Sequence, residues 1–245
     1  MNQPSVTAAL LIIGNEILTG ETRDANLAYL GAGLAALGIR LAEARVVADD
    51  EDAIVAALNE LRRRFDYVFT TGGIGPTHDD ITAASVAKAF GRPLILHPEA
   101  HEILLGYYKP GELNEARLRM AHTPEGAELV ENPISGAPGF QVENVFVLAG
   151  IPSVMQAMFQ SLRHRLTGGR RLLSETIVAY LPEGRMAAGL GAIQAANPDV
   201  EIGSYPFHKE GRYGARLVLR ATDPERLALV GDAVAALVEE LSAGG

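Results

Sequence analysis

A repeated alternation of short apolar runs with amphipathic segments is the feature that most limits how this chain can fold. The run from Val6 to Gly14 is apolar throughout and rich in branched side chains, which is typical of a strand buried on both faces. Further strands are predicted at residues 39–47, 66–71 and 92–97, with helices at residues 24–38, 50–65 and 79–91 between them. Because strands and helices that alternate with short connections form right-handed crossovers, the pattern predicts a mostly parallel sheet covered by helices.

The helix boundaries follow from spacing and charge. In the helix over residues 24–38, four leucines between Leu27 and Leu37 recur at intervals of three and four, and Gly38 is expected to end the helix. The helix over residues 50–65 begins with acidic residues and ends with arginines, as the helix dipole favours. Two more strands are predicted at residues 127–132 and 143–150, and a closing helix at residues 151–166.

A stretch rich in glycine and arginine, Thr167–Arg171, marks a change in organisation. Beyond it the predicted elements are a strand at residues 173–181, a helix at 185–196, strands at 200–208 and 213–222, and a helix at 223–241. This β-α-β-β-α order is typical of a small two-layer α+β domain. We therefore predict two domains, residues 1–168 and 169–245.

Composition excludes several classes of function. A net charge of −9, no tryptophan and 6% aromatic residues disfavour binding to nucleic acid, which needs a basic face or stacking platform. The absence of cysteine excludes disulfides, zinc–thiolate sites and cysteine nucleophiles, and fits a cytoplasmic location. No apolar run approaches the roughly 20 residues of a membrane span, so we expect neither membrane insertion nor secretion. These features favour a protein that binds a small molecule.

The stretch TTGGIGPTHDD, residues 70–80, is the first candidate site. Glycines at Gly72, Gly73 and Gly75 follow a strand and precede a helix, so their backbone N–H groups could face an anion at the helix start. The spacing matches neither the dinucleotide-binding fingerprint nor the phosphate loop with its lysine. The competing interpretation is a plain turn in which Asp79 caps the helix.

Acidic residues beside a phosphate cradle need a cation between them. Asp79 and Asp80 would repel a phosphate unless a Mg²⁺-type ion joined carboxylates and phosphate oxygens. Asp49 and Asp50 follow the second strand, and neighbouring parallel strands end at the same edge, so they could face the same crevice. His78 is a further candidate contact to metal or phosphate. The alternative is that these acids are solvated helix caps and that His78 is an ordinary exposed histidine.

A third polar stretch, GNEILTGETRDAN, follows the first strand. Glu16 and Asn26 lie in it, at another carboxyl end of the predicted sheet. The alternative is an ordinary loop in which Asp24 caps the next helix.

These segments together resemble a known family. GNEILTGETRDAN, TTGGIGPTHDDIT, NPISGAPGF and LAGIPSVM occur in the order seen in the CinA (competence/damage-inducible protein A) family, whose amino-terminal domain belongs to the MoaB/Mog molybdopterin-binding superfamily. The resemblance extends from about Val6 to Leu166, and the segment around IGSYPF is similar to the small subdomain of this family. It implies a three-layer αβα domain with a mostly parallel sheet, a small α+β subdomain, and a crevice for a pterin or nucleotide phosphate.

The resemblance also implies activities. In relatives that make the molybdenum cofactor, an aspartate after the second strand and another after the glycine loop serve molybdopterin adenylylation; these positions match Asp49 or Asp50, and Asp80. In CinA-type domains the implied activity is metal-dependent cleavage of a nucleotide pyrophosphate such as ADP-ribose or FAD. Our leading hypothesis is this hydrolase; a pterin-binding or adenylylating protein and a non-catalytic nucleotide-binding module are the alternatives.

The hypothesis assigns a role to each motif residue. The catalytic candidates are Asp80, Asp49 and Asp50, and the metal ligands, for Mg²⁺ or Co²⁺, are Asp79 and Asp80. The predicted ligand-binding residues are Gly72, Gly73, Gly75, Pro76, Thr77, Thr82, Glu16, Asn26 and Gly139.

Two departures from the family pattern affect what the resemblance implies. Full-length CinA proteins continue into a nicotinamide-mononucleotide deamidase domain, for which 245 residues leave no room, so that activity is not expected. Ser153 stands where the family usually has glutamate, so contacts near the last motif are not carried over. Relatives assemble as dimers or trimers, and we expect a homo-oligomer here too.

Overall fold

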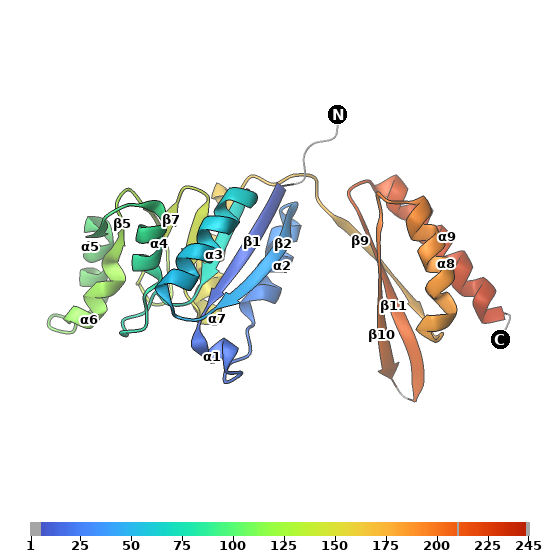
Figure 1. Ribbon diagram of the computed structural model, residues 1–245, viewed down its shortest axis with the longest axis horizontal. Coiled ribbons are helices and arrows are strands. Elements are labelled where there is room, and N and C mark those ends of the chain that lie inside the picture. Colours follow the sequence, from blue (N-terminus) through green and yellow to red (C-terminus); the bar gives the residue numbers. More distant parts are fainter. Residues whose placement is uncertain (1–5, 210, 244–245) are drawn as a thin grey trace. The chain divides into compact units, whose positions relative to one another are not determined.

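The chain divides into two compact units, with the boundary between Gly169 and Arg170 (Figure 1). The computed structural model describes residues 6–209 and 211–243. Within these ranges no helix combines the length and apolar character that a bilayer crossing requires.

A six-stranded sheet forms the centre of the first unit, and it is mostly parallel, as the sequence predicts. Its strand at Gly139–Val142 was not predicted from the sequence. Its strands are β1 (Val6–Ile13), β2 (Ile39–Val47), β3 (Tyr67–Thr71), β6 (Glu128–Val130), β7 (Gly139–Val142) and β8 (Val145–Leu148). Their order across the sheet is β2-β1-β3-β8-β7-β6. β2, β1, β3 and β8 run parallel to one another. β7 pairs antiparallel with β8, and β6 pairs antiparallel with β7. The carboxyl ends of β2, β1, β3 and β8 therefore meet at one edge.

Helices cover both faces of this sheet, which gives the predicted three layers (Figure 1). They are α1 (Asn15–Leu18), α2 (Asn26–Ala36), α3 (Glu51–Arg64), α4 (Thr82–Phe90) and α7 (Pro152–Leu162). Helices α2 and α7 bury Leu34 and Phe159 against one face, and α3 and α4 bury Leu58 and Val86 against the other. One part of the leucine pattern is wrong: Leu27 is 40% exposed, because it lies in the first turn of α2, outside the core.

The segment between α4 and β6 differs most from the sequence-based expectation. The predicted strand over residues 92–97 forms as β4 (Leu94–Leu96), but it pairs with β5 (His122–Pro124) in a separate two-stranded sheet. Leu94 and Leu96 are exposed, which is incompatible with a strand buried on both faces. The other elements of this segment, which the sequence did not reveal, are α5 (Pro98–Tyr107), α6 (Glu115–Leu118) and the 3₁₀ helix Arg119–Ala121.

An ion-pair network fixes α3 on β2 and thereby places the acidic loop between them. The Arg45 guanidinium donates to both carboxylate oxygens of Glu60, each at 2.7 Å. The hydrogen bonds from Arg45, aided by Arg64, lower the pKa of Glu60 to about 2. Residues 48–50 connect the two elements that this network holds.

The second unit has the predicted β-α-β-β-α order. Its elements are β9 (Leu173–Ala179), α8 (Glu183–Ala196), β10 (Glu201–Lys209), β11 (Arg212–Ala221) and α9 (Pro224–Ala243). The strands form an antiparallel sheet in the order β10-β11-β9. Met186 of α8 and Val234 of α9 are fully buried with Leu217 of β11, so the unit has its own core.

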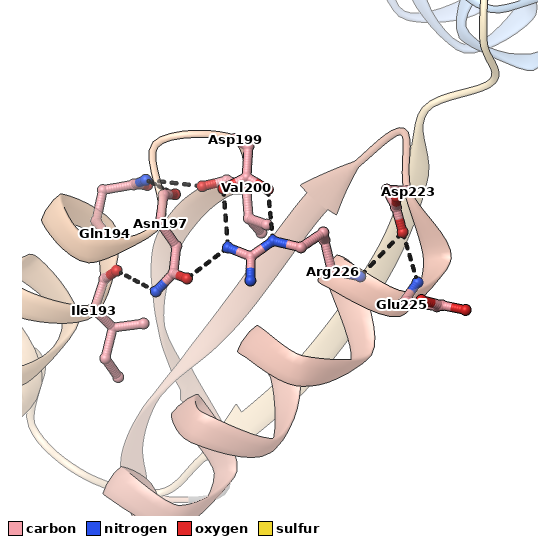
Figure 2. A network of polar contacts seen from close by, with 8 residues as sticks. All are labelled: Ile193, Gln194, Asn197, Asp199, Val200, Asp223, Glu225 and Arg226. Atoms are coloured by element: carbon pink, nitrogen blue, oxygen red, sulfur yellow. Dashed lines mark hydrogen bonds and ion pairs between the residues drawn. The ribbon is translucent and has the colours of Figure 1, made fainter.

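A polar network anchors α9 to the connection between α8 and β10 (Figure 2). The Arg226 guanidinium donates to both carboxylate oxygens of Asp199, at 2.7 and 3.0 Å, and to the Asn197 side-chain oxygen at 2.7 Å. The pKa of Asp199 is lowered chiefly by this contact. Asn197 and Asp199 thus stabilise the packing of α9 against the connection between α8 and β10.

Candidate functional site

Four loops meet at the carboxyl edge of the parallel strands. The amide of Gly14, after β1, donates to the carbonyl of Val47 at the end of β2 (3.2 Å). The amide of Gly72, after β3, donates to the carbonyl of Leu148 at the end of β8 (3.2 Å). The Asn26 side-chain amide donates to the carbonyl of Gly150 (2.8 Å). The loops after β1, β2, β3 and β8 therefore form one continuous edge.

The glycine loop is built by a close approach of the backbone. Gly72 and Gly73 have φ values of 102° and 65°, which only glycine adopts without strain. A Cβ on Gly72 would lie 2.1 Å from the carbonyl oxygen of Ile13, so no side chain fits there. Thr82 closes the loop: its hydroxyl donates to the carbonyl of Gly72 (2.9 Å) and its amide to that of Gly73 (3.0 Å).

Two predicted roles change in this loop. Thr82 is fully buried and its hydroxyl is used inside the protein, so it holds the loop instead of facing a ligand. The competing interpretation, in which Asp79 caps the helix, is wrong, because α4 begins at Thr82 and not at residue 79, after Ile81, which provides no side-chain cap. The Thr82 amide finds its partner in the loop itself, at the carbonyl of Gly73.

The acids after the glycines have separate environments. Asp80 Oδ2 accepts hydrogen bonds from the amide of Thr77 (2.8 Å) and from the Thr77 hydroxyl, which leaves Oδ1 available. The pKa of Asp79 is lowered from its usual value, chiefly by the nearby Thr77 side chain, with smaller contributions from its own backbone amide and from His78. His78 is 94% exposed and Asp79 is 59% exposed. Pro76 and Thr77 are exposed as well.

A small pocket lies beside this loop, and two of its residues were not expected from the sequence. Gly73, Gly75 and Asp80 line it together with Arg119 and His122. Arg119 lies in the 3₁₀ helix and His122 in β5, about forty residues after the glycine loop. Among the described residues no side chain pairs with Arg119, which is exposed at this pocket. No sequence motif identifies Arg119. It reaches this pocket only because the segment that contains α5 and α6 folds back toward the glycine loop.

The structure distinguishes Asp49 from Asp50. Asp50 Oδ1 accepts from the amide of Ala53 (2.8 Å) and caps α3. Asp49 Oδ2 instead accepts from the amide of Asn15 (2.8 Å), at the loop that follows β1. Asp49 therefore points along the loop edge, whereas Asp50 serves its own helix.

The remaining predicted residues lie apart from the glycine-loop pocket. Glu16 and Asn26 line a second cavity on the α2 side of the sheet. Asp24 lines it too, and its Oδ1 accepts from the amide of Leu27 in the first turn of α2 (2.8 Å), although the residue at the cap position is Ala25. Gly139 is buried, and a Cβ there would lie 2.3 Å from the carbonyl oxygen of Val147. We conclude that Gly139 allows β7 and β8 to pack, and does not line the pocket.

The predicted metal ligands do not form a complete protein site. No group of three acidic, histidine or cysteine side chains within residues 6–209 and 211–243 is arranged to hold a metal ion. β1 lies between β2 and β3, so the acids that follow β2 and β3 start from positions two strand spacings apart, about 10 Å.

Comparison with known families finds a match in each unit. Residues 9–167 match the family described as "Probable molybdopterin binding domain". Residues 171–245 match the family described as "FAD synthase, middle domain".

Individual relatives agree with these matches. A protein from Archaeoglobus fulgidus is 36% identical over 197 residues, which cover 80% of this chain and 84% of that protein. A CinA-like protein from Geobacter metallireducens is 36% identical and matches 96% of this chain, which spans only 60% of that relative's length. The crystal structure of the protein CinA with unknown function from Thermoplasma acidophilum is 33% identical, with a TM-score of 0.63, and covers 66% of this chain and 98% of that one.

The close approach at Gly72 predicts a large loss of stability when a side chain is added. Gly72→Ala is expected to lower the free energy of unfolding by about 3 kcal/mol or more, because positive φ and a backbone clash act together. Gly91→Ala is the matched control: its φ is 62°, but open space surrounds its Cβ position, so about 1–2 kcal/mol is expected. Urea unfolding of the variants measures both, and equal losses would contradict the close approach.

Proposed function

The chain belongs to the family of probable molybdopterin binding domains, and we propose that its first unit is a metal-dependent nucleotide pyrophosphatase. The family resemblance predicted from the motifs is confirmed, including its CinA-like relatives. The hydrolytic activity goes beyond that membership and rests on the chemistry at the loop edge.

The observation that carries the proposal is the charge arrangement in the glycine-loop pocket. Arg119 contributes a cation and Asp80 a carboxylate to the same small pocket as Gly73 and Gly75. A guanidinium without a protein partner is suited to a phosphate, which it can bind through two hydrogen bonds. A carboxylate would repel a phosphate by itself, so its presence favours an ion bound between the two.

Each residue has a role in the proposed site. Backbone amides of Gly73 and Gly75 hold phosphate oxygens, and Arg119 neutralises the charge that they carry. Asp80, with one free oxygen, and Asp79, whose pKa is lowered, offer hard oxygen ligands at the loop. Asp49 extends the acidic edge from the neighbouring loop.

The donor set fits a metal ion that is shared with the substrate. Mg²⁺ is commonly held by one or two carboxylates together with substrate phosphates, and does not need a cage made only of protein ligands. Asp79 and Asp80 supply carboxylates of that kind. When bound, such an ion polarises the phosphoryl oxygens and lowers the pKa of a bound water. Co²⁺ is the second ion that we propose.

The proposed reaction is hydrolysis of a phosphoanhydride. The oxygen of a water molecule bonds to one phosphorus while the P–O bond to the bridging oxygen breaks. The bridging oxygen leaves with the other phosphate; one proton of the water passes to solvent, and the other stays on the phosphate that has gained the water oxygen or also passes to solvent. The protein's contribution is to fix the two phosphates and to stabilise their charge as the bond breaks.

The second unit supports a nucleotide as substrate. Its match is to the middle domain of FAD synthase, a protein whose name implies a flavin dinucleotide, and it directly follows the phosphate-binding candidate. We therefore propose ADP-ribose or an FAD-like dinucleotide as substrate class.

A pterin is the second candidate ligand, favoured by the description of the family. In that case the same loop would bind the phosphate of molybdopterin, and ATP-dependent adenylylation would replace hydrolysis. A fluorescent pterin that co-purifies with the protein would support this alternative. Nucleotide binding without turnover under any metal would instead support a non-catalytic binding module. Assembly into a dimer or trimer remains a prediction.

Loss of the Asp80 charge is expected to abolish turnover. Asp80→Asn keeps an oxygen that can accept from Thr77, but should reduce kcat for ADP-ribose or FAD hydrolysis at least about 100-fold with Mg²⁺ or Co²⁺. Chelation by EDTA should abolish the activity of the unmodified protein. Phosphate-ester products are measured by chromatography. Turnover that survives in Asp80→Asn would contradict the assigned role, and turnover in EDTA would contradict the metal.

Asp49 and Asp50 can be separated with a matched pair of variants. Asn at position 50 still caps a helix, so Asp50→Asn should leave the melting temperature and kcat nearly unchanged. Asp49→Asn can still accept from the Asn15 amide but removes a negative charge from the loop edge, so kcat should fall at least about tenfold. A larger fall in kcat for Asp50→Asn than for Asp49→Asn would show that Asp50, and not Asp49, contributes to turnover.

Arg119 is expected to act on substrate binding. Arg119→Gln should raise KM at least about tenfold, since a hydrogen bond to a charged phosphate is lost. Arg63→Gln removes an equally exposed positive charge from α3 and is the control for net charge. Equal changes in KM for the two variants would mean that only overall charge, and not the pocket, is involved.

A further inference from the structure

A second cavity lies at the same sheet edge, separate from the glycine-loop pocket. It is formed by the ends of β1 and β3, the loop before α2, and the start of α7. Its volume is about 50 Å³, and none of its lining residues belongs to the glycine-loop pocket. That volume admits a few water-sized groups, or one edge of a ring.

Two residues that line this cavity each carry a buried polar atom with no hydrogen-bond partner in the described chain. The atoms are Oδ1 of Asn26, a residue 4% exposed, and Oγ1 of Thr71, a residue 1% exposed. The Asn26 side chain is oriented by its amide, which donates to the carbonyl of Gly150 (2.8 Å), so Oδ1 remains as an acceptor. A buried polar atom without a partner costs free energy, and it is rare in folded proteins unless a ligand or water completes it.

The walls of the cavity favour a neutral ligand group that donates hydrogen bonds. Glu16 and Asp24 contribute carboxylates and Arg23 one cation, so the charged side chains sum to about one negative charge. Asn26 adds an acceptor and Thr71 a hydroxyl. Phosphate brings only acceptors and negative charge, and is disfavoured here.

The apolar part of the lining favours a ring. Ile12, Ile17 and Pro152 face the same cavity as Asn26 and Thr71. A heterocycle presents apolar faces and a polar edge, so it satisfies both kinds of wall at once.

We propose that this cavity binds the amino-bearing edge of a heterocycle, with Asn26 and Thr71 as its hydrogen-bond partners. The proposal rests on the proposed function in one respect: the phosphates of the same ligand lie at the glycine loop. The cavity then determines which organic group the site accepts. A nucleobase and a pterin share the required chemistry, an exocyclic amine on a flat ring.

Thr71→Val tests the proposal, and Thr70→Val is its matched control. Both hydroxyls are buried and without a partner in the described residues, and the two positions are adjacent in β3. Because side chains alternate along a strand, Thr71 lies on the face of Phe69, toward α2, and Thr70 on the opposite face with Val68. Valine has the same shape as threonine, and neither substitution removes a hydrogen bond within the protein.

The probes separate the organic group from the phosphates. They are α,β-methylene-ADP, which resists hydrolysis; methylenediphosphonate, which carries the phosphates alone; and adenosine and 6-hydroxymethylpterin, which carry the rings alone. Titration calorimetry with Mg²⁺ gives Kd for the unmodified protein and both variants. Melting temperatures are measured in parallel, and neither variant should melt at a lower temperature than the unmodified protein.

Thr71→Val should raise Kd for α,β-methylene-ADP, or for the ring that binds, about three- to tenfold. Methylenediphosphonate should bind equally to all three proteins, and Thr70→Val should bind every probe like the unmodified protein. Adenosine or the pterin, whichever loses affinity in Thr71→Val, identifies the ring. Equal affinities in Thr71→Val and Thr70→Val would overturn the proposal and indicate a cavity that holds only water. A loss for methylenediphosphonate as large as for the nucleotide would overturn it too.

Failure of the phosphate site gives a different result. If methylenediphosphonate and α,β-methylene-ADP do not bind, the proposed pyrophosphatase site is wrong. The cavity is then judged by adenosine and 6-hydroxymethylpterin: binding that Thr71→Val weakens supports it, and the absence of binding overturns it.

Discussion

The close approach of Gly72 to the carbonyl of Ile13 is the constraint on which the site depends. It brings the end of β3 against the end of β1, at a distance that excludes any side chain. The same glycine donates its amide to Leu148, so the end of β8 is joined to the same point. Three strand ends are thereby fixed, and the loops that follow them can present backbone amides and side chains in a constant arrangement.

Two chemically different sites result from this junction. The pocket on the side of α4 contains glycine amides, Arg119 and Asp80, and suits phosphates with an accompanying cation. The cavity on the side of α2 contains Asn26 and Thr71 among apolar walls, and suits a neutral ring edge. A nucleotide or a pterin phosphate has both kinds of group, which is why the proposals for the two sites concern one ligand.

Much of the first unit could be predicted because its periodicity is strong. The strands β1, β2 and β3 and the helices α2 and α3 carry clear apolar patterns, and the structure has them where the sequence predicts. The segment from β4 to α6 was not predicted correctly, because its elements are short and β4 is exposed, so the apolar periodicity is weak. The start of α4 was misplaced because aspartate often caps helices, whereas here the loop's own carbonyl takes that role. The pair of threonines at the end of the apolar β3 was a detectable signal, since polar side chains in a buried strand require partners.

The sequence by itself determined the three-layer architecture, the glycine loop and the acids near it, since apolar spacing and glycine content act locally along the chain. Only the tertiary structure decided which groups are available at the loop edge. Asp49 accepts a hydrogen bond from the segment after β1, whereas Asp50 caps α3. The Thr82 hydroxyl is hydrogen-bonded within the glycine loop. Arg119 reaches the pocket from a segment far away in the chain. These choices depend on which backbone groups happen to lie within hydrogen-bond distance after the strands have paired, and no local pattern specifies that.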